Sequence, residues 1–454
     1  MSGVLLLQSS PAKLEDIQKR IFSKNALEFV ANLHRKFDTR VDQLYKSRLQ
    51  RAINLKHDVT LNFKISSERN DFTWKVAPLP VRLQDRHVDL GDVSAANASH
   101  FAAALIADVQ GVQVDFDDGH CPTWKNQLLA YNNINLAVNG KLPGAPISIT
   151  TCPIDGKEAI GPLVDFGIIM FHNAKKLYEA NSGPYFYLSK LEGSEEAKLW
   201  NDIFVWSQEQ LDLPQKSIKA CVLIENIIST FEMDEILYAL KDHCMGLNCG
   251  IWDYCASIIA KFGDHKEFLI PDRNKYVNMD QIFLNSYMKL VVNTCHKRGA
   301  LATGGMAAAM LKPGTDGNDE KSKAIISKVL EAKSKEIEAG VDGFMVYDSR
   351  IVPHVNETCF ITVMELHSQL WKKSGASPNQ INRIIDINIT PRDLLLIPTG
   401  GVTMQGLKHN VAVSILFIYH WLAGIGHFFY NGNVEDSATA EISRAQIWQW
   451  IRFS

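Results

Sequence analysis

The sequence lacks several features that would assign it to common classes of protein. Its formal net charge is only −3, from 47 Lys and Arg against 50 Asp and Glu, so it has no broad basic field that would attract nucleic acid. No stretch approaches the roughly 18 consecutive apolar residues that a membrane span needs. None of its eight cysteines forms a CxxC pair, the spacing of many redox and zinc sites. We therefore expect neither nucleic acid nor membrane as a partner, and we expect the partners to be small molecules.

The cysteines and the two ends of the chain indicate a compartment. Several cysteines lie in apolar runs, such as Cys221 within residues 220–224, which predicts reduced, mostly buried thiols of an intracellular protein. The apolar patch at residues 4–7 is followed at once by charged residues and forms no cleavable signal. The last residues, 451–454, are not a peroxisomal Ser-Lys-Leu tripeptide. We expect a cytoplasmic protein, whose oligomeric state the sequence does not indicate.

The chain is long enough for a large core and alternates between two kinds of pattern. It has 454 residues with 46% hydrophobic content. Apolar residues at helical spacing predict an N-terminal helical segment between residues 13 and 55. Seven short β-rich runs then alternate with helical patterns, at residues 112–117, 147–152, 185–191, 220–225, 246–253, 300–305 and 343–347.

This alternation predicts the fold class. Strands that alternate with helices pair in parallel through crossovers, and seven runs nearly complete an α/β fold of the (β/α)₈ TIM barrel type. The eighth strand is not evident. The predicted organisation is an N-terminal helical segment at residues 1–72, a barrel at 73–370, and a truncated C-terminal helical segment with a catalytic loop at 371–454.

Two of the predicted strands end in acidic residues. Glu225 ends the run at 220–225, and Asp253 ends the run at 246–253. The C-terminal ends of parallel barrel strands meet at one mouth, where active sites are built. Carboxylates there suit Mg²⁺, which takes one or two of them and leaves its other positions to water and substrate oxygens. The alternative is that each residue is a surface acid near a strand end.

Motifs in a fixed order extend from Trp74 towards the C-terminus. They include Trp74-Lys75-Val76-Ala77-Pro78, Asp115-Phe116-Asp117-Asp118, Gly183-Pro184-Tyr185-Phe186-Tyr187-Leu188, Val222-Leu223-Ile224-Glu225, Gly246-Leu247-Asn248-Cys249-Gly250-Ile251-Trp252-Asp253 and Glu435-Asp436-Ser437-Ala438-Thr439-Ala440-Glu441. Together they resemble malate synthase of the shorter, non-G class. The resemblance implies an acyltransferase of the glyoxylate cycle, which joins acetyl-CoA to glyoxylate, or a related keto or aldehyde acid, and releases malate and CoA. It also implies Mg²⁺ and leaves a peroxisomal location open beside the cytoplasmic one.

The resemblance assigns roles to three acids. It implies that Glu225 and Asp253 bind the metal and that Asp436 is the base that removes a methyl proton from acetyl-CoA. A thioester α-proton is weakly acidic, so the base must be held against the methyl group while positive charge stabilises the enolate. The alternative for Asp436 is a carboxylate that only caps the start of the helix-like run after it.

The implied substrate-binding residues are Asp117, Gly250, Ile251 and Trp252. Backbone N–H groups at the last three positions are the expected donors to the anionic acceptor. Two of these residues depart from the family. Asp117 replaces a glutamate and shortens its reach, and Ile251 replaces an arginine.

The largest departure concerns an arginine. Residues 149–155, Ile-Thr-Thr-Cys-Pro-Ile-Asp, stand where the family has Arg-Pro-Arg-Gly-Trp-His, and no arginine or lysine lies between Lys141 and Lys157. The first family arginine is expected to bind the glyoxylate oxygen and the enolate, whereas the Thr150 hydroxyl brings no charge. Loss of one such donor costs on the order of 10²- to 10³-fold in rate.

Two further departures bear on the substrates. Asp348-Ser349-Arg350 replaces the family's His-Pro-Gly, where the CoA nucleotide is expected to bind, and Arg350 is a candidate to restore a positive charge there. We also expect a more open site, because the family's C-terminal helical domain is truncated. Two alternatives stay open: a catalytically impaired homologue with a binding or regulatory role, and an acyl-CoA lyase or hydrolase.

Overall fold

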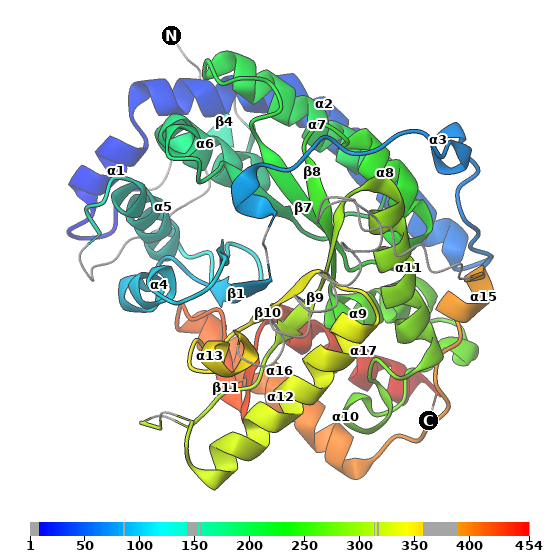
Figure 1. Cartoon of the computed structure of the whole chain (residues 1–454). Helices are drawn as coiled ribbons and strands as arrows, with labels where there is room; N and C mark the ends of the chain where they lie inside the picture. The colour runs from blue at the N-terminus through cyan, green and yellow to red at the C-terminus, as the bar shows by residue number, and fades with distance from the viewer. Residues whose placement is uncertain are drawn as a thin grey trace, which may run out of the picture.

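The computed structural model describes residues 9–84, 87–142, 153–154, 157–158, 160–312, 314–315, 317–356 and 388–453. Seven parallel strands form one sheet in the order β2-β1-β10-β9-β8-β7-β6, which curls into a nearly closed barrel with helices around it (Figure 1). The strands are β1 Val88–Val93, β2 Gly111–Val114, β6 Tyr185–Leu188, β7 Lys219–Ile224, β8 Cys244–Cys249, β9 Leu301–Ala307 and β10 Gly343–Val346. The predicted barrel fold is confirmed, while the run at 147–152 lies outside the described residues.

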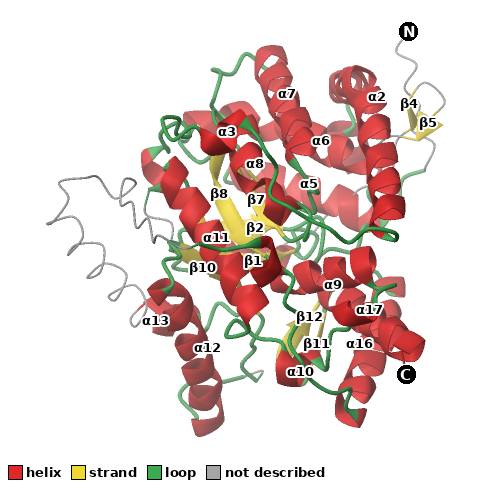
Figure 2. Cartoon of the chain, turned by 90° about the vertical axis from the view of Figure 1, so that its right-hand side faces the viewer, coloured by secondary structure: helices red, strands yellow, loops and turns green. Residues whose placement is uncertain are grey.

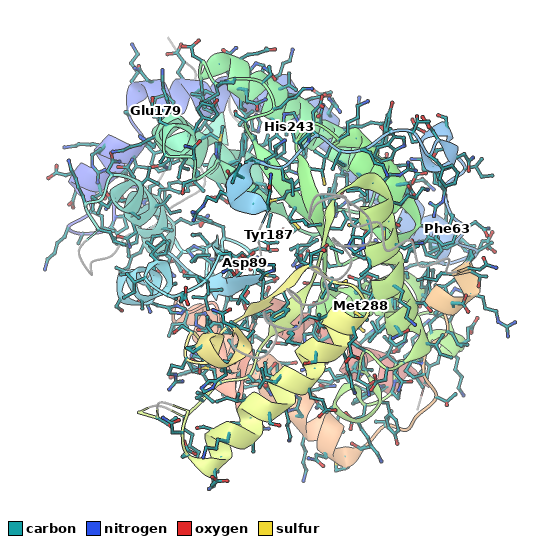
Figure 3. All side chains as sticks on the ribbon, in the orientation of Figure 1. Phe63, Asp89, Glu179, Tyr187, His243 and Met288 are labelled. Carbon is teal, nitrogen blue, oxygen red and sulfur yellow. The ribbon has the colours of Figure 1, made fainter. Side chains whose placement is uncertain are left out.

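Strand β1 is the barrel strand that the sequence did not reveal. It lies between β2 and β10, with Asp89 opposite Gly111 on one side and Met345 on the other. Its sequence, Val-Asp-Leu-Gly-Asp-Val, has two acids and a glycine in place of an apolar run, yet the whole strand is buried. Asp89 accepts a hydrogen bond from the Tyr187 hydroxyl of edge strand β6 at 2.9 Å (Figure 3). This contact joins strands near opposite edges of the sheet and so helps to close the barrel.

Helices connect successive strands and cover the outside of the barrel. They are α4 Ala98–Leu105, α5 Trp124–Val138, α6 Gly161–Glu179, α7 Ser194–Gln210, α8 Met233–Ala239, α9 Ile251–Phe262, α10 Arg273–Tyr276, α11 Ile282–Arg298 and α12 Glu320–Glu338. Shorter elements are α3 Ser67–Asn70, α13 Val352–Val355, α15 Pro391–Leu394, the 3₁₀ turns η1 Val81–Leu83, η2 Ser229–Glu232 and η3 Lys266–Phe268, and the antiparallel pair β4 Pro153–Ile154 and β5 Lys157–Glu158. No helix in the described part of the chain is both long and apolar enough to cross a bilayer.

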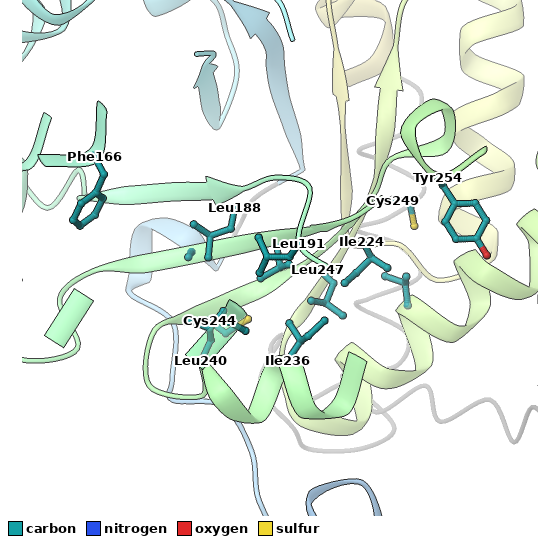
Figure 4. Packing of buried hydrophobic residues seen from close by; sticks show 14 of the residues in the cluster. Phe166, Leu188, Leu191, Ile224, Ile236, Leu240, Cys244, Leu247, Cys249 and Tyr254 are labelled. Atoms are coloured by element: carbon teal, nitrogen blue, oxygen red, sulfur yellow. The ribbon is translucent and has the colours of Figure 1, made fainter. Parts of the chain in front are cut away.

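The burial of the central strands explains why the sequence predicted them. All residues of β7 and β8 are buried, as expected for strands covered on both faces. Ile224 and Leu247 from these strands lie near Ile236 and Leu240 around α8 in one apolar cluster (Figure 4). The six cysteines within the described ranges are free and buried, in agreement with the expected thiols.

The N-terminal helical pattern forms two helices outside the barrel. They are α1 Glu15–Ile21 and α2 Lys24–Leu55, and α2 lies along α6 and α7 (Figure 1). Phe29 of α2 packs against Phe171 and Trp206, with ring centroids 6.0 and 5.4 Å apart. The long helix therefore braces two neighbouring barrel helices.

The C-terminal segment lies across one end of the barrel. It contains α16 Met404–Leu422, the hairpin of β11 Phe428–Tyr430 and β12 Asn433–Glu435, and α17 Ser437–Phe453. Helix α17 packs against α16 and α9 (Figure 2). The hairpin is tied to the chain just after β9, because Val434 N–H donates to the Ala308 carbonyl at 2.8 Å and Met310 N–H to the Gly432 carbonyl at 2.9 Å. The loop that carries Asp436 is thereby fixed at the barrel mouth.

Arg298 joins the segment before β1 to the outer helices, and its removal should destabilise the fold. The side chain is fully buried. Its Nε donates to Asp234 Oδ1 at 2.8 Å, and its Nη2 donates to the Glu68 and Arg69 carbonyls at 2.9 and 3.1 Å. We expect Arg298→Met to lower the free energy of unfolding by about 3–5 kcal/mol, because the Asp234 carboxylate stays buried without its guanidinium. Urea denaturation followed by tryptophan fluorescence measures the change.

Arg444 provides the matched control. Its guanidinium pairs with Glu441 on the surface of α17, and its side chain is 65% exposed. Arg444→Met should change the free energy of unfolding by less than about 1 kcal/mol. Equal effects of the two substitutions would contradict the structural role of Arg298.

Candidate active site

An acidic cluster lies at the C-terminal ends of the barrel strands. Asp118, Glu225 and Asp253 each offer a carboxylate oxygen, and these oxygens lie within 4.8 Å of one another. Asp118 follows β2, and Glu225 comes directly after β7. The structure thus brings together Glu225 and Asp253, the two ligands expected from the sequence, and adds Asp118. Oxygen donors of this kind suit a hard divalent cation such as Mg²⁺.

Asp253 lies in a helix, although the sequence pattern predicted that it ends a strand. Strand β8 ends at Cys249, the chain turns at Gly250, and Asp253 lies in the first turn of α9. A Cβ atom on Gly250 would lie 2.8 Å from Glu225 Cβ and 3.0 Å from its Oε2, so the turn requires glycine. The prediction was wrong because Ile251 and Trp252 continue the apolar run of the strand into the helix.

Lys190 places an ammonium group among the carboxylates. Its backbone is in the left-handed region, with φ of 55°, and its N–H donates to Glu225 Oε1 at 2.6 Å. Its Nζ lies 3.0 Å from Asp117 Oδ2, 3.2 Å from Asp118 Oδ2, 3.1 Å from Asp253 Oδ2 and 3.8 Å from Glu225 Oε1. Burial alone would lower the pKa of Lys190, but these carboxylates outweigh it and raise the pKa well above its ordinary value. Lys190 is therefore charged.

The cluster has more negative than positive charge. Burial raises the pKa of Glu225 and of Asp118 well above the ordinary range, and it also raises that of Asp253, while the Lys190 ammonium opposes each shift. One ammonium cannot neutralise four neighbouring carboxylates, so a divalent cation would relieve the remaining repulsion. Asp118 was not predicted from the sequence as a third oxygen donor, although the acidic run at 115–118 could have indicated it, and the contacts of Lys190 were not predicted either.

The loop after β2 is organised by one buried carboxylate. Asp115 accepts hydrogen bonds from the N–H groups of Asp117 at 2.7 Å, Asp118 at 3.3 Å, and Gly119. Burial, reinforced by the charge of Asp117, raises the pKa of Asp115 to about 6. The turn directs Asp117, whose side chain is 40% exposed, and Asp118 towards Lys190.

The expected anion donors at the start of α9 are only partly free. The N–H of Gly250 donates to the Tyr287 hydroxyl at 3.0 Å and is therefore engaged. The N–H groups of Ile251 and Trp252 belong to the first turn of α9, which has no side-chain cap. Arg273 lies over the Trp252 ring, with the guanidinium carbon 4.9 Å from the ring centroid. Two backbone donors thus remain at this helix N-terminus, next to Asp253.

Asp436 caps a helix and faces the acidic cluster at the same time. Its Oδ1 accepts the Thr439 N–H at 2.9 Å, and its own N–H donates to Thr439 Oγ1 at 2.9 Å, so the capping role is real. The side chain is nonetheless buried beside the cluster, where its charge contributes to the raised pKa of Asp118 and Asp253. Ser437, the next residue, donates its hydroxyl to Asp118 Oδ1.

A cavity of about 300 Å³ is lined in part by residues of the hairpin that precedes Asp436. Residues lining it include Leu90, His100, Tyr347, Asp348, His427 and Phe429. His427 Nδ1 lies 3.0 Å from the Gly119 carbonyl, which only accepts, so Nδ1 carries the proton and Nε2 accepts from the Tyr347 hydroxyl at 2.9 Å. Burial lowers the pKa of His427 and keeps it neutral. This pair was not predicted from the sequence, because it joins segments that are far apart in the chain.

Arg350 does not supply a free positive charge to the site. Its Nη2 donates to Asp348 Oδ2 at 2.6 Å and to the Leu311 carbonyl at 2.8 Å, and its Nη1 donates to the Lys312 carbonyl at 2.8 Å. The guanidinium therefore fastens the loop after β9 to the loop after β10. Thr150, which lies in the stretch where the family has an arginine, is outside the described residues.

Comparisons with known proteins agree on one family. The family model described as "Malate synthase, TIM barrel domain" matches residues 144–395, "Malate synthase, C-terminal" matches 401–454, and "Malate synthase, N-terminal domain" matches 11–58. Malate synthase of Dictyostelium discoideum is 36% identical, over 97% of this chain and 84% of its own length. Malate synthase of Streptomyces clavuligerus is 37% identical over 96% and 83%, and malate synthase A of Escherichia coli is 34% identical over 96% and 83%.

The acidic cluster predicts a specific response to Mg²⁺. Asp253→Asn should abolish stabilisation by Mg²⁺, because it removes one of three converging oxygen donors. In the wild type, the ion should add about 2.7 kcal/mol at roughly 100 times its dissociation constant. Without Mg²⁺ the variant should melt at or above the wild-type temperature, since it lacks one repelling charge. Differential scanning fluorimetry with Mg²⁺ and with EDTA measures both effects.

Asp202→Asn is the control for this experiment. Asp202 is half exposed and pairs with Arg40 at the protein surface. This variant should keep the full wild-type response to Mg²⁺. A response of Asp253→Asn as large as that of the control would refute the metal site.

Proposed function

The chain belongs to the malate synthase family, and on this premise it condenses acetyl-CoA with glyoxylate and water to give malate and CoA; we propose that Glu225, Asp253 and Asp436 carry its chemistry. The observation that supports this assignment best is the convergence of three carboxylates within 4.8 Å at the barrel mouth, with Asp436 beside them. Family membership does not favour the alternatives of a regulatory homologue, a lyase or a hydrolase.

We assign the acceptor side of the site to the acidic cluster and to the start of α9. Glu225 and Asp253, with Asp118, are the residues that would hold Mg²⁺. When bound, Mg²⁺ supplies the positive charge that polarises the glyoxylate aldehyde. The N–H groups of Ile251 and Trp252 would receive the glyoxylate carboxylate, because a helix N-terminus favours an anion.

Two more residues complete the acceptor side. Gly250 leaves the space that a side chain would fill against Glu225. Asp117, whose side chain is 40% exposed at the mouth, is the acidic group within reach of an entering substrate and pairs with Lys190 at 3.0 Å. We propose that this pair keeps the Lys190 ammonium close to the developing negative charge.

The donor side is assigned to Asp436 and the adjacent cavity. Oδ1 of Asp436 is held by the Thr439 N–H, so we assign Oδ2 as the atom that takes the methyl proton of acetyl-CoA. The cavity of about 300 Å³ is lined by Asp348 and Ser349, where the family resemblance implies contact with CoA. It also borders His427, whose pKa responds to the charge of Asp436. We propose that the thioester enters through this cavity and presents its methyl group to Asp436.

Two statements about this chain stay predictions from its sequence. One is the division at residues 1–72, 73–370 and 371–454. The other is the cytoplasmic location; a 35% identical relative, from Candida tropicalis, is named "Malate synthase, glyoxysomal".

Asp436→Asn separates capping from catalysis. Asparagine is as good an N-cap as aspartate, so it should keep the hydrogen bond from Thr439, but it cannot accept a proton. We expect the exchange of acetyl-CoA methyl protons with deuterated water, and thiol release with glyoxylate and Mg²⁺, to fall by about 10²- to 10⁴-fold. Binding of CoA, measured by calorimetry, should remain nearly unchanged.

Glu441→Gln is the control, because Glu441 lies on the solvent side of α17 in a surface pair with Arg444. It should leave both rates as they are. Exchange by Asp436→Asn at the wild-type rate would reject Asp436 as the base. A wild-type protein with neither methyl exchange nor thiol release, with glyoxylate or any short keto acid, would reject condensation and favour the binding-protein alternative.

The missing arginine predicts a slow enzyme. An ordinary turnover number is about 10 s⁻¹, and loss of one charged donor to the transition state lowers the rate by on the order of 10²- to 10³-fold. We therefore expect thiol release well below the ordinary rate at saturating substrates. A turnover near the ordinary value would show that another cation fills this role, and Lys190 is the cation in contact with the cluster.

A further inference from the structure

Asp92 is a buried acid that the assignments above leave unused. It is the penultimate residue of β1 and is 6% exposed. Its φ of 54° lies in the left-handed region, which is uncommon for residues other than glycine and is tolerated best by Asn and Asp. The strand therefore adopts a strained conformation at the point where it presents this carboxyl group to the barrel mouth.

The surroundings of Asp92 are acidic. The charges of Asp436, Asp115 and Asp118 all act on it, after the larger effect of burial. No donor among the described residues reaches its Oδ2. On another side the loop after β2 packs tightly against it, because a Cβ atom on Gly119 would lie 2.8 Å from the Asp92 carbonyl oxygen. Lys190, the nearby ammonium, is engaged by the carboxylates of the metal cluster.

A carboxyl group in this position takes up a proton. Ionisation would place a second buried negative charge beside the Asp436 carboxylate with no cation to offset it. Burial, and then the neighbouring charges, accordingly raise the pKa of Asp92 well above its ordinary range. The carboxyl groups of Asp92 and Asp436 are within hydrogen-bonding contact. Two ionised carboxylates could not form this hydrogen bond, because neither has a proton to donate.

The proton of this pair belongs on Asp92 for a structural reason. Asp436 already accepts the N–H of Thr439 at 2.9 Å at the start of α17. Asp92 Oδ2 has no such donor. A hydrogen bond between the two acids therefore has Asp92 as its donor and Asp436 as its acceptor.

We propose that Asp92 is a positioning residue whose neutral carboxyl group donates a hydrogen bond to the Asp436 carboxylate and holds it in place as the base. This inference rests on the proposed role of Asp436. It assigns a function to the acid of β1 at the barrel mouth, and it explains why the strained backbone at Asp92 is kept there.

The proposal has a pH dependence with a defined sign. The groups that face Asp92 are Asp436 before α17, Asp115 and Asp118 after β2, and Tyr347 after β10, whose own pKa Asp92 helps to raise. A carboxyl group with a raised folded-state pKa stabilises the fold fully below its unfolded pKa of about 4. That contribution is lost as the pH rises through the folded-state pKa. The hydrogen bond to Asp436 is lost over the same range.

Asp92→Asn and Asp92→Gly test the proposal. Asparagine tolerates the left-handed backbone and donates a hydrogen bond at every pH, whereas glycine relieves the backbone but removes the donor. We expect Asp92→Asn to keep methyl-proton exchange within a few-fold of the wild type and to lose its alkaline decline. Asp92→Gly should lower exchange by about 10- to 100-fold through misplacement of the base, with KM for acetyl-CoA unchanged.

Asp212 supplies the matched control. It has a φ of 52° and is exposed, so Asp212→Asn and Asp212→Gly make the same chemical changes away from the site. Neither should alter the exchange rate or its pH profile. An Asp92→Asn variant that loses as much exchange as Asp92→Gly, or that retains the alkaline decline, would overturn the proposal.

Melting temperatures test the protonation of Asp92 independently of catalysis. As the pH rises above the ordinary aspartate pKa of about 4, the wild type should lose stability relative to Asp92→Asn, because only the wild type ionises at this position. Parallel melting curves would overturn the proposal even if Asp92→Gly does not fold. Absence of exchange in the wild type would reject the proposed function of Asp436, whereas the melting comparison would still decide whether Asp92 is neutral.

Discussion

Repulsion between carboxylates is the constraint on which the barrel mouth depends. Acids that follow β2, β7 and β8 converge there, and the Lys190 ammonium contacts all four that surround it, at 3.0–3.8 Å. Buried like charges repel strongly because little water screens them. The strand ends can therefore approach one another only around that ammonium, or around a metal ion. The left-handed backbone of Lys190 and the glycine at position 250 are the local adjustments that make this approach possible.

The C-terminal segment completes the mouth, and its position is coupled to that of the acidic cluster. Helix α17 packs on α9, which carries Asp253, so a shift of one helix displaces both Asp253 and Asp436. Buried polar contacts also hold α17 to the segment after η3, since Gln449 Oε1 accepts the Ile270 N–H at 2.9 Å and Trp450 Nε1 donates to the Ile270 carbonyl at 2.8 Å. The two halves of the site are thus held by one packed unit, although they lie far apart in the sequence.

The sequence predicted the barrel because its central strands are buried on both faces and so form apolar runs. Strand β1 was not predicted because Asp89 and Asp92 interrupt its apolar pattern; these acids contact β6 and the loop before α17. The convergence of Glu225 and Asp253 was predicted from strand ends and from motifs. The roles of Lys190 and Asp92 could not be predicted from the sequence, because these roles depend on which charged groups surround each side chain. No local pattern encodes the neighbours that a closed barrel brings together.

Asp436 shows why capping and catalysis need not be competing interpretations of one residue. The N–H of Thr439 donates to Oδ1 of its carboxylate at 2.9 Å, and the side chain is buried beside the acidic cluster. The cap uses Oδ1, whereas Oδ2 is the oxygen to which we assign proton abstraction. The helix that follows Asp436 therefore fixes the orientation in which the proposed base would meet a substrate. The capping geometry is in this sense a precondition for the chemistry, and an isosteric amide is the substitution that separates the two.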